Sequence, residues 1–185
     1  MSTIQNAPPT DLDSLRWSET LRDGSNVLIR PITRQDKAGE RDFIEGLSAE
    51  ARRYRFLGQI GSPSDRMLER FTNIDYLHDM AFVAVVQEGA RERIVGVSRY
   101  ATDPSGRGCE CAVTVSDDWQ DRGLGTTLMR HIIEFARTKG MGTLYSIDSA
   151  ENVAMKDLAR FLGFRTRPDP SDADQVIHEL ALGGS

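Results

Sequence analysis

The stretch VSDDWQDRGLGTTLMRHIIEF, residues 115–135, joins the end of a strand, a polar loop and the start of a helix. Leu124, Leu128 and Ile132 recur every four residues, which predicts a helix over residues 124–138. Two glycines stand at its start, although glycine loses more conformational entropy on folding than other residues. At a helix start, glycines let a ligand approach free backbone N–H groups, so the stretch predicts an anion site.

Three phosphate-binding designs compete for this loop. A Walker loop needs Gly-Lys-Ser/Thr, which is absent. The dinucleotide pattern G-x-G-x-x-G requires glycine at position 128, where Leu128 stands, and it begins directly at the end of a strand. Asp148 is the one residue in its favour, because it occupies the position of the acid that binds the ribose. The pattern Q/R-x-x-G-x-G is matched by Gln120, Gly123 and Gly125. An ordinary tight turn remains the alternative without a ligand.

The remaining pattern predicts an α/β fold, with a largely antiparallel central sheet flanked by helices. Residues 81–88, 93–101 and 108–115 are rich in β-formers and are separated by turn residues, which predicts an antiparallel meander. Helices are expected after Thr33, after Ser48 and from Pro63 or Ser64. The other expected elements are strands at 26–32, 143–148, 164–167 and 175–182 and a helix at 152–164.

Composition limits the domain count and the classes of partner. The 185 residues carry 28 acidic and 23 basic side chains, and this net charge of -5 disfavours nucleic acid. The basic run Arg52, Arg53 and Arg55 is typical of a solvated face, although it could hold an anion. Residues 1–16 are polar and aperiodic, which predicts a flexible tail before a single domain over residues 17–185.

No secretory leader pattern or long apolar run occurs, so we expect a cytoplasmic protein with no membrane partner. The oligomeric state is open, and a homodimer is one alternative. Cys109 and Cys111 lie two apart on a predicted strand, where their side chains share a face and are poorly placed to form a disulfide. The three histidines are scattered, so we expect reduced cysteines and no metal.

The glycine motif resembles the acyl-CoA-binding motif of the GNAT N-acetyltransferase superfamily. The resemblance extends over residues 22–182 and includes the helix NVAMKDLARFLGF. A narrower likeness is to the GNAT domain of bacterial protein lysine acetyltransferases. It is carried by LRDGSNVLIRPITRQD, RYRFLG, IDYLHDMAFVAV, CECAVTVSDDWQDRGLG and NVAMKDLARFLGF.

The resemblance implies a GNAT-like fold, acetyl-CoA as co-substrate and a sheet that splits between the strands at 108–115 and 143–148. The loop N–H groups would bind the pyrophosphate of CoA, and strand residues would pair with the pantetheine amides. The implied cofactor-binding residues are Val113, Val115, Gln120, Asp121, Arg122, Gly123, Leu124, Gly125, Thr126 and Asn152. Helix capping is an alternative for Asn152.

Glu110 is the implied catalytic base, because it matches the position of the catalytic glutamate in the protein lysine acetyltransferases. Its neighbours are apolar, so we expect it to be buried; the alternative is an exposed or ion-paired carboxylate. Ala159 stands where many members of the superfamily place a tyrosine general acid. Asp75 and Tyr76 lie in the segment that usually shapes the acceptor site.

The implied function is transfer of an acetyl group from acetyl-CoA to a primary amine, with a protein lysine as the first expected acceptor. A small amine or amino acid is the rival acceptor. A non-catalytic acyl-CoA sensor is the rival class, motivated by Ala159. A nucleic-acid-binding module is the most distant alternative, because only Arg52, Arg53 and Arg55 favour it.

Overall fold

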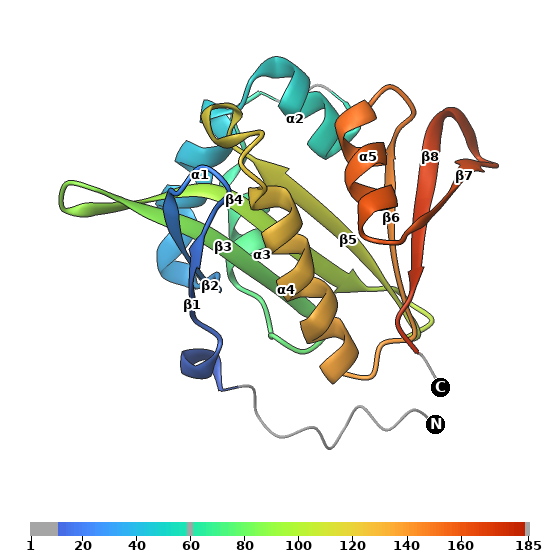
Figure 1. The fold of residues 1–185 in the computed structure, drawn as a ribbon, viewed down its shortest axis with the longest axis horizontal. Coiled ribbons are helices and arrows are strands. Elements are labelled where there is room, and N and C mark those ends of the chain that lie inside the picture. Colours follow the sequence, from blue (N-terminus) through green and yellow to red (C-terminus); the bar gives the residue numbers. More distant parts are fainter. Residues whose placement is uncertain (1–10, 59–60, 184–185) are drawn as a thin grey trace.

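The predicted meander forms the centre of an eight-stranded sheet in the computed structural model, which describes residues 11–58 and 61–183. The strand order is β1-β2-β3-β4-β5-β6-β8-β7, and every neighbouring pair is antiparallel except β5–β6. Figure 1 shows the sheet running across the molecule. The strands are β1 Trp17–Thr20, β2 Asn26–Pro31, β3 Asp79–Glu88, β4 Arg91–Thr102, β5 Gly108–Val115, β6 Thr143–Ser149, β7 Arg165–Asp169 and β8 Asp172–Ala181.

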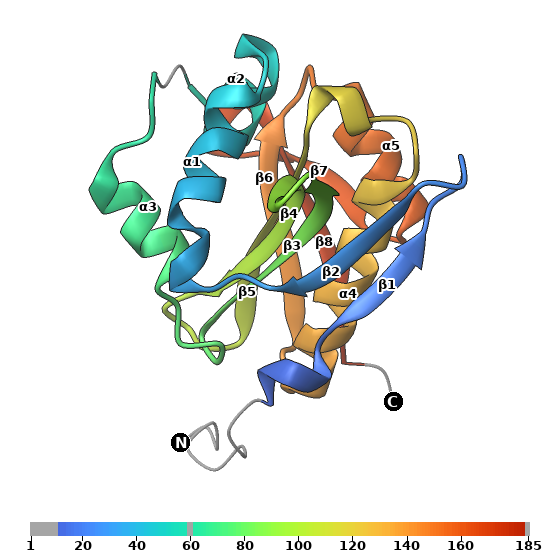
Figure 2. The same cartoon turned by 90° about the vertical axis from the view of Figure 1, so that its left-hand side faces the viewer.

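Helices cover both faces of the sheet. Figure 2 shows α1 and α3 on one side and α4 on the other. The helices are α1 Lys37–Gly46, α2 Ala49–Phe56, α3 Asp65–Thr72, α4 Leu124–Thr138 and α5 Val153–Phe161, with short 3-10 turns at Leu12–Ser14, Arg34–Asp36 and Asp117–Trp119. Successive strand side chains face opposite sides, so Phe82 packs with the α4 core and Val83 with the α1–α3 core.

The predicted split in the sheet is confirmed. The parallel strands β5 and β6 pair over three residues, and the last pair is Glu110 with Tyr145. Beyond this pair the two strands diverge, as Figure 1 shows, and they end at Val115 and Ser149. Helices α2 and α5 lie at this diverging end of the sheet (Figure 1). The split therefore leaves one edge of β5 open toward the space between these helices.

Local sequence signals fix several helix ends. The Oγ atom of Ser48 accepts the Ala51 N–H at 3.1 Å, and that of Ser64 accepts the Met67 N–H at 3.1 Å, as N-caps do. The helix expected after Thr33 begins as the 3-10 turn Arg34–Asp36 and becomes α-helical at Lys37. These starts agree with the sequence-based expectation.

The sequence did not indicate strand β1, which pairs antiparallel with β2. Of the expected tail, residues 1–10 lie outside the described residues. The rest contains the turn Leu12–Ser14, and Leu15 packs against the core. Cys109 and Cys111 are buried and free, as predicted.

Candidate active site

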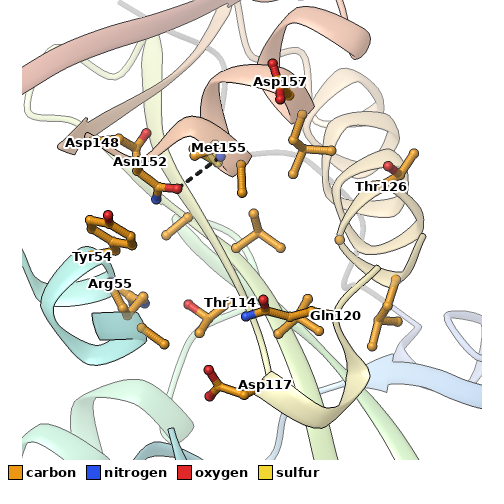
Figure 3. Close-up of a pocket in the computed structure, with 18 of the residues that line it drawn as sticks. Tyr54, Arg55, Thr114, Asp117, Gln120, Thr126, Asp148, Asn152, Met155 and Asp157 are labelled. Carbon is orange, nitrogen blue, oxygen red and sulfur yellow. Dashed lines mark hydrogen bonds between the residues drawn. The ribbon is translucent and has the colours of Figure 1, made fainter. Parts of the chain in front are cut away.

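A pocket of about 850 Å³ opens where β5 and β6 diverge. Figure 3 shows its wall, formed by α2 on one side and by α5 and the start of α4 on the other. The structure brings most of the predicted site together here. The predicted residues that line the pocket are Glu110, Val113, Val115, Gln120, Asp121, Gly123, Leu124, Gly125, Thr126 and Asn152.

The glycine loop presents free N–H groups to this pocket. Gly123 adopts a left-handed φ of 84°, a conformation that suits glycine, at the N-cap of α4. The Thr127 N–H donates to the Gly123 carbonyl at 3.1 Å. The N–H groups of Leu124, Gly125 and Thr126 precede that bond and lack acceptors within the helix. The start of α4 is therefore suited to an anion.

Arg122 contributes its backbone to this loop, while its side chain turns to neighbouring groups. Its guanidinium donates to the Asp118 carbonyl at 2.8 Å, lies 3.2 Å from the Asp23 carboxylate and stacks on Trp119 at 4.3 Å. The sequence analysis missed Arg22, which lines the pocket. A Cβ at position 123 would lie 3.1 Å from its Nε atom, so Arg22 packs against the loop.

The open edge of β5 forms the floor of the pocket. On one side, Val113 and Val115 are paired with Ser98 and Gly96 of β4. On the other side, pairing with β6 ends at Glu110, so residues 111–115 border the pocket. An extended chain that carries amide groups can add to such an edge as a strand does.

Glu110 occupies the last rung before the strands diverge. It lies opposite Ala101 of β4 and Tyr145 of β6. The expectation that Glu110 is buried is wrong, because its side chain is exposed. The neighbouring Cys109 and Cys111 are buried on the α4 side of the strand, and alternation places Glu110 on the other face. The carboxylate is therefore accessible from the pocket that it lines.

Asp148 of β6 is a further carboxylate on the pocket wall, and the sequence analysis did not assign it a role in this site. Its Oδ2 atom accepts the Ser146 hydroxyl at 2.6 Å and lies 3.7 Å from Nε2 of the fully buried His178. The other ring nitrogen of His178 lies 2.7 Å from the Thr166 hydroxyl. Burial raises the pKa of Asp148 and lowers the pKa of His178. Both directions favour a neutral pair.

Asn152 caps α5, because its Oδ1 atom accepts the Met155 N–H at 3.1 Å. Figure 3 shows this bond at the pocket, between Asp148 and the start of α5. The amide group of Asn152 also lines the pocket, so capping and ligand contact are compatible in this geometry. Ala159, two turns further along α5, is fully buried.

Asp75 and Tyr76 do not line this pocket. Burial opposes ionisation of Asp75, but backbone N–H groups of Asp79, Leu77 and His78 outweigh it and hold the pKa of Asp75 at about 2. The Tyr76 hydroxyl donates to the Ile32 carbonyl at 2.7 Å. The geometry thus gives both residues structural contacts, and their expected acceptor role is not supported by their position.

Within residues 11–58 and 61–183, no group of three or more His, Cys, Asp or Glu side chains is arranged to hold a metal ion. Among the same residues, no helix combines the length and apolarity needed to cross a membrane.

The sequence pattern of the Acetyltransferase (GNAT) family matches residues 45–164, which include α4, the glycine loop and Glu110. The chain belongs to the GNAT acetyltransferase family. Acetyltransferase PA5475 of Pseudomonas aeruginosa is 48% identical over 186 residues, which is 98% of this chain and 100% of that relative. Acetyltransferase Pat of Mycolicibacterium smegmatis is 28% identical over 144 residues, and the match spans 77% of this chain but 42% of Pat.

Solved structures show the same GNAT fold. The crystal structure of the GNAT domain of S. lividans PAT superimposes with a TM-score of 0.83 at 25% identity, over 90% of this chain and 96% of that domain. The structure of yncA from Salmonella typhimurium with its cofactor acetyl-CoA has a TM-score of 0.69 at 18% identity, over 86% of this chain and 95% of that one. The predicted family, its fold and the likeness to PAT are confirmed.

Proposed function

We propose that this GNAT protein transfers an acetyl group from acetyl-CoA to a primary amine. The family, the free N–H groups at the start of α4 and the open edge of β5 support this activity. The observation that carries the proposal is the position of Glu110, an accessible carboxylate at the last β5–β6 rung and on the wall of the same pocket.

The pocket has the chemistry that CoA requires. The N–H groups of residues 122–126 bind the pyrophosphate, with Gln120 and Asp121 on the approach to the loop. Arg122 is the one residue of this stretch that is not part of the pocket lining. The backbone of Val113 and Val115 pairs with the pantetheine amides, as an added strand would. Asn152 hydrogen-bonds the same arm while it caps α5.

Glu110 removes a proton from the acceptor amine, because a protonated amine cannot attack the thioester. A lysine-like amine has a pKa of roughly 10.4 and is protonated at neutral pH, so it needs a base beside the thioester. Glu110 accepts that proton directly or through one water. The neutral amine then attacks the thioester carbonyl and the bond between carbon and sulfur breaks. The new amide nitrogen releases its second proton to solvent.

No tyrosine acid stands at position 159 to protonate the departing sulfur. The thiol of CoA has a pKa of roughly 8.5, so it departs as a thiolate without a side-chain acid. Solvent protonates it after release. Ala159 therefore removes one catalytic aid without blocking the reaction.

The first proposed acceptor is a protein lysine, which the likeness to the GNAT domain of PAT supports. A small amine or amino acid is the second. A sensor that binds acyl-CoA without turnover is the alternative class, and the buried Ala159 favours it.

Release of CoA from acetyl-CoA tests the proposal, with lysine-bearing proteins, polyamines and amino acids as acceptors. One class should stimulate release by wild type, and Glu110→Gln should abolish the stimulation. Glu134→Gln, on the exposed face of α4, is the matched control. Tight acetyl-CoA binding with no acceptor-stimulated release would favour the sensor.

A further inference from the structure

Arg55 on α2 is a cation on the pocket wall whose guanidinium lacks an acceptor. It lies over the rings of Phe56 at 5.0 Å and Phe71 at 5.7 Å, and Figure 3 shows it beside Tyr54. Among the described residues, its N–H groups make no hydrogen bond or ion pair. Its helix neighbour Arg53, by contrast, is exposed and pairs with Glu151 at 3.3 Å.

The carboxylates around Arg55 act on it from a distance, because among the described residues none accepts a hydrogen bond from it or lies within ion-pair distance. Glu40, Glu110 and Asp148 all favour the charged guanidinium. Glu40 itself pairs with Arg99 at 3.1 Å. Burial, together with the like charge of Arg99, lowers the pKa of Arg55 to about 10. Arg55 therefore stays protonated at neutral pH. The guanidinium nitrogens of Arg55 are not among the buried atoms without partners in the described residues, so they are accessible from the pocket, where the oxygen atoms of a ligand can accept from them.

Thr114 is a second polar group in this pocket that lacks a partner. Its Oγ1 atom is buried and has no hydrogen-bond partner within the described residues, and Thr114 lines the pocket with Arg55. Thr114 and Glu110 are four residues apart on β5, so their side chains share one face of the strand. A hydroxyl and a guanidinium can both donate to a carboxylate.

The phosphates of CoA are assigned to the other wall, at the start of α4. An anion bound at Arg55 would therefore belong to the acceptor or to the acyl group that CoA carries. We propose that Arg55, with Thr114, binds a carboxylate that the acceptor carries near its reactive amine, and this inference rests on the proposed function. Glu110 takes the proton from the amine while Arg55 holds the carboxylate.

Two sources supply that chemistry: the carboxylate of a free amino acid, and an acidic side chain next to a lysine in a protein. The test uses matched pairs of acceptors that differ only in this charge. One arm compares L-lysine and 6-aminohexanoate with their primary amides. The other compares lysine peptides that carry glutamate or glutamine beside the lysine.

Wild type should acetylate the acceptor that carries the carboxylate faster than its neutral counterpart in one of the two comparisons. A preference among the small molecules identifies a free amino acid as the acceptor, and a preference among the peptides identifies a protein lysine. Arg55→Gln should lower kcat/KM for that member roughly tenfold to hundredfold, mainly through KM, and leave its neutral counterpart within about twofold. Arg55→Lys should restore part of the preference, because it retains the charge. Arg53→Gln, on the same helix, is the control and should resemble wild type.

An equal loss for charged and neutral acceptors in Arg55→Gln would overturn the inference and leave Arg55 as a packing residue. A wild type that prefers neutral acceptors would also overturn it, as would a preference for succinyl-CoA over acetyl-CoA that depends on Arg55. Calorimetric titration of L-lysine and the glutamate peptide, with CoA present, separates the two proposals. Arg55-dependent binding without transfer would refute the proposed function alone, and equal binding by wild type and Arg55→Gln would refute the subsite alone.

Discussion

Glu110 and Tyr145 form the last paired rung between β5 and β6, and beyond it the two strands separate. This relationship places a carboxylate on the wall of a pocket that the start of α4 also lines. The proposed base and the proposed anion site are thus positioned by one strand, since β5 runs from Glu110 to Val115 and the glycine loop follows it in the chain. Sites built on strands and helix ends are held more precisely than sites on free loops.

The two loop glycines should respond differently to alanine. Gly123→Ala places a Cβ at a φ of 84° and 3.1 Å from Arg22 Nε, which should cost about 1–2 kcal/mol of stability. At Gly125 a Cβ meets Leu158 and Val115 at ordinary distances of 3.6 and 3.8 Å, so Gly125→Ala should fold normally. It should nevertheless weaken CoA binding, because the methyl group obstructs the approach of phosphate. Thermal unfolding measures the stability of both variants, and titration with CoA measures their affinity. An unchanged CoA affinity in both variants would contradict the proposal that this loop binds the pyrophosphate.

His178 should make stability depend on pH. Its pKa is lowered from 6.5 by burial, against the attraction of Asp148, so the unfolded chain binds more protons than the folded one in this range. Its contribution to stability is present above pH 6.5 and is lost as pH falls through the lower pKa of the folded state. The free energy of unfolding should therefore fall as pH drops below 6.5, and fall less steeply in His178→Gln. The raised pKa of Asp148 acts in the opposite direction, because the folded chain takes up a proton there, and so reduces the slope. His78→Gln, at an exposed position, is the control; a slope equal to wild type in both variants would contradict the assignment.

Asp75 should stabilise the folded state rather than bind the acceptor. Its pKa of about 2 in the folded state, against 3.8 as the ordinary value, means that its contribution is present above pH 3.8 and is lost as pH falls toward 2. Because the side chain is half exposed, Asp75→Asn should cost only about 1 kcal/mol at neutral pH. Urea unfolding measures this cost. A rise in acceptor KM without loss of stability would instead support the acceptor role that the sequence suggested.

The sequence predicted the elements that carry strong local signals. The spacing of Gln120, Gly123 and Gly125 pointed to a loop that lines the pocket, and Ser48 and Ser64 marked helix starts that the structure confirms. Strand β1 was missed because its four residues WSET carry little apolar alternation; its pairing with β2 is a tertiary effect.

Features that depend on distant contacts could not be predicted. Strand alternation places Glu110 on the face opposite Cys109 and Cys111, but its exposure also depends on the end of β5–β6 pairing at Tyr145, which the local sequence does not show. Arg55 was read within a solvated basic run, yet the packing of α2 against β5 and β6 places it at the pocket. Asp148 and His178 meet only because β6 pairs with β8.

The most direct test of the account is single-turnover acetyl transfer by Glu110→Gln, measured together with its affinity for acetyl-CoA. The account predicts a rate reduced roughly 10²- to 10⁴-fold at neutral pH, with the acetyl-CoA dissociation constant within about twofold of wild type. Glu134→Gln should match wild type in both. An unchanged rate in Glu110→Gln, with acetyl transfer intact in wild type, would contradict the assignment of Glu110 as the base.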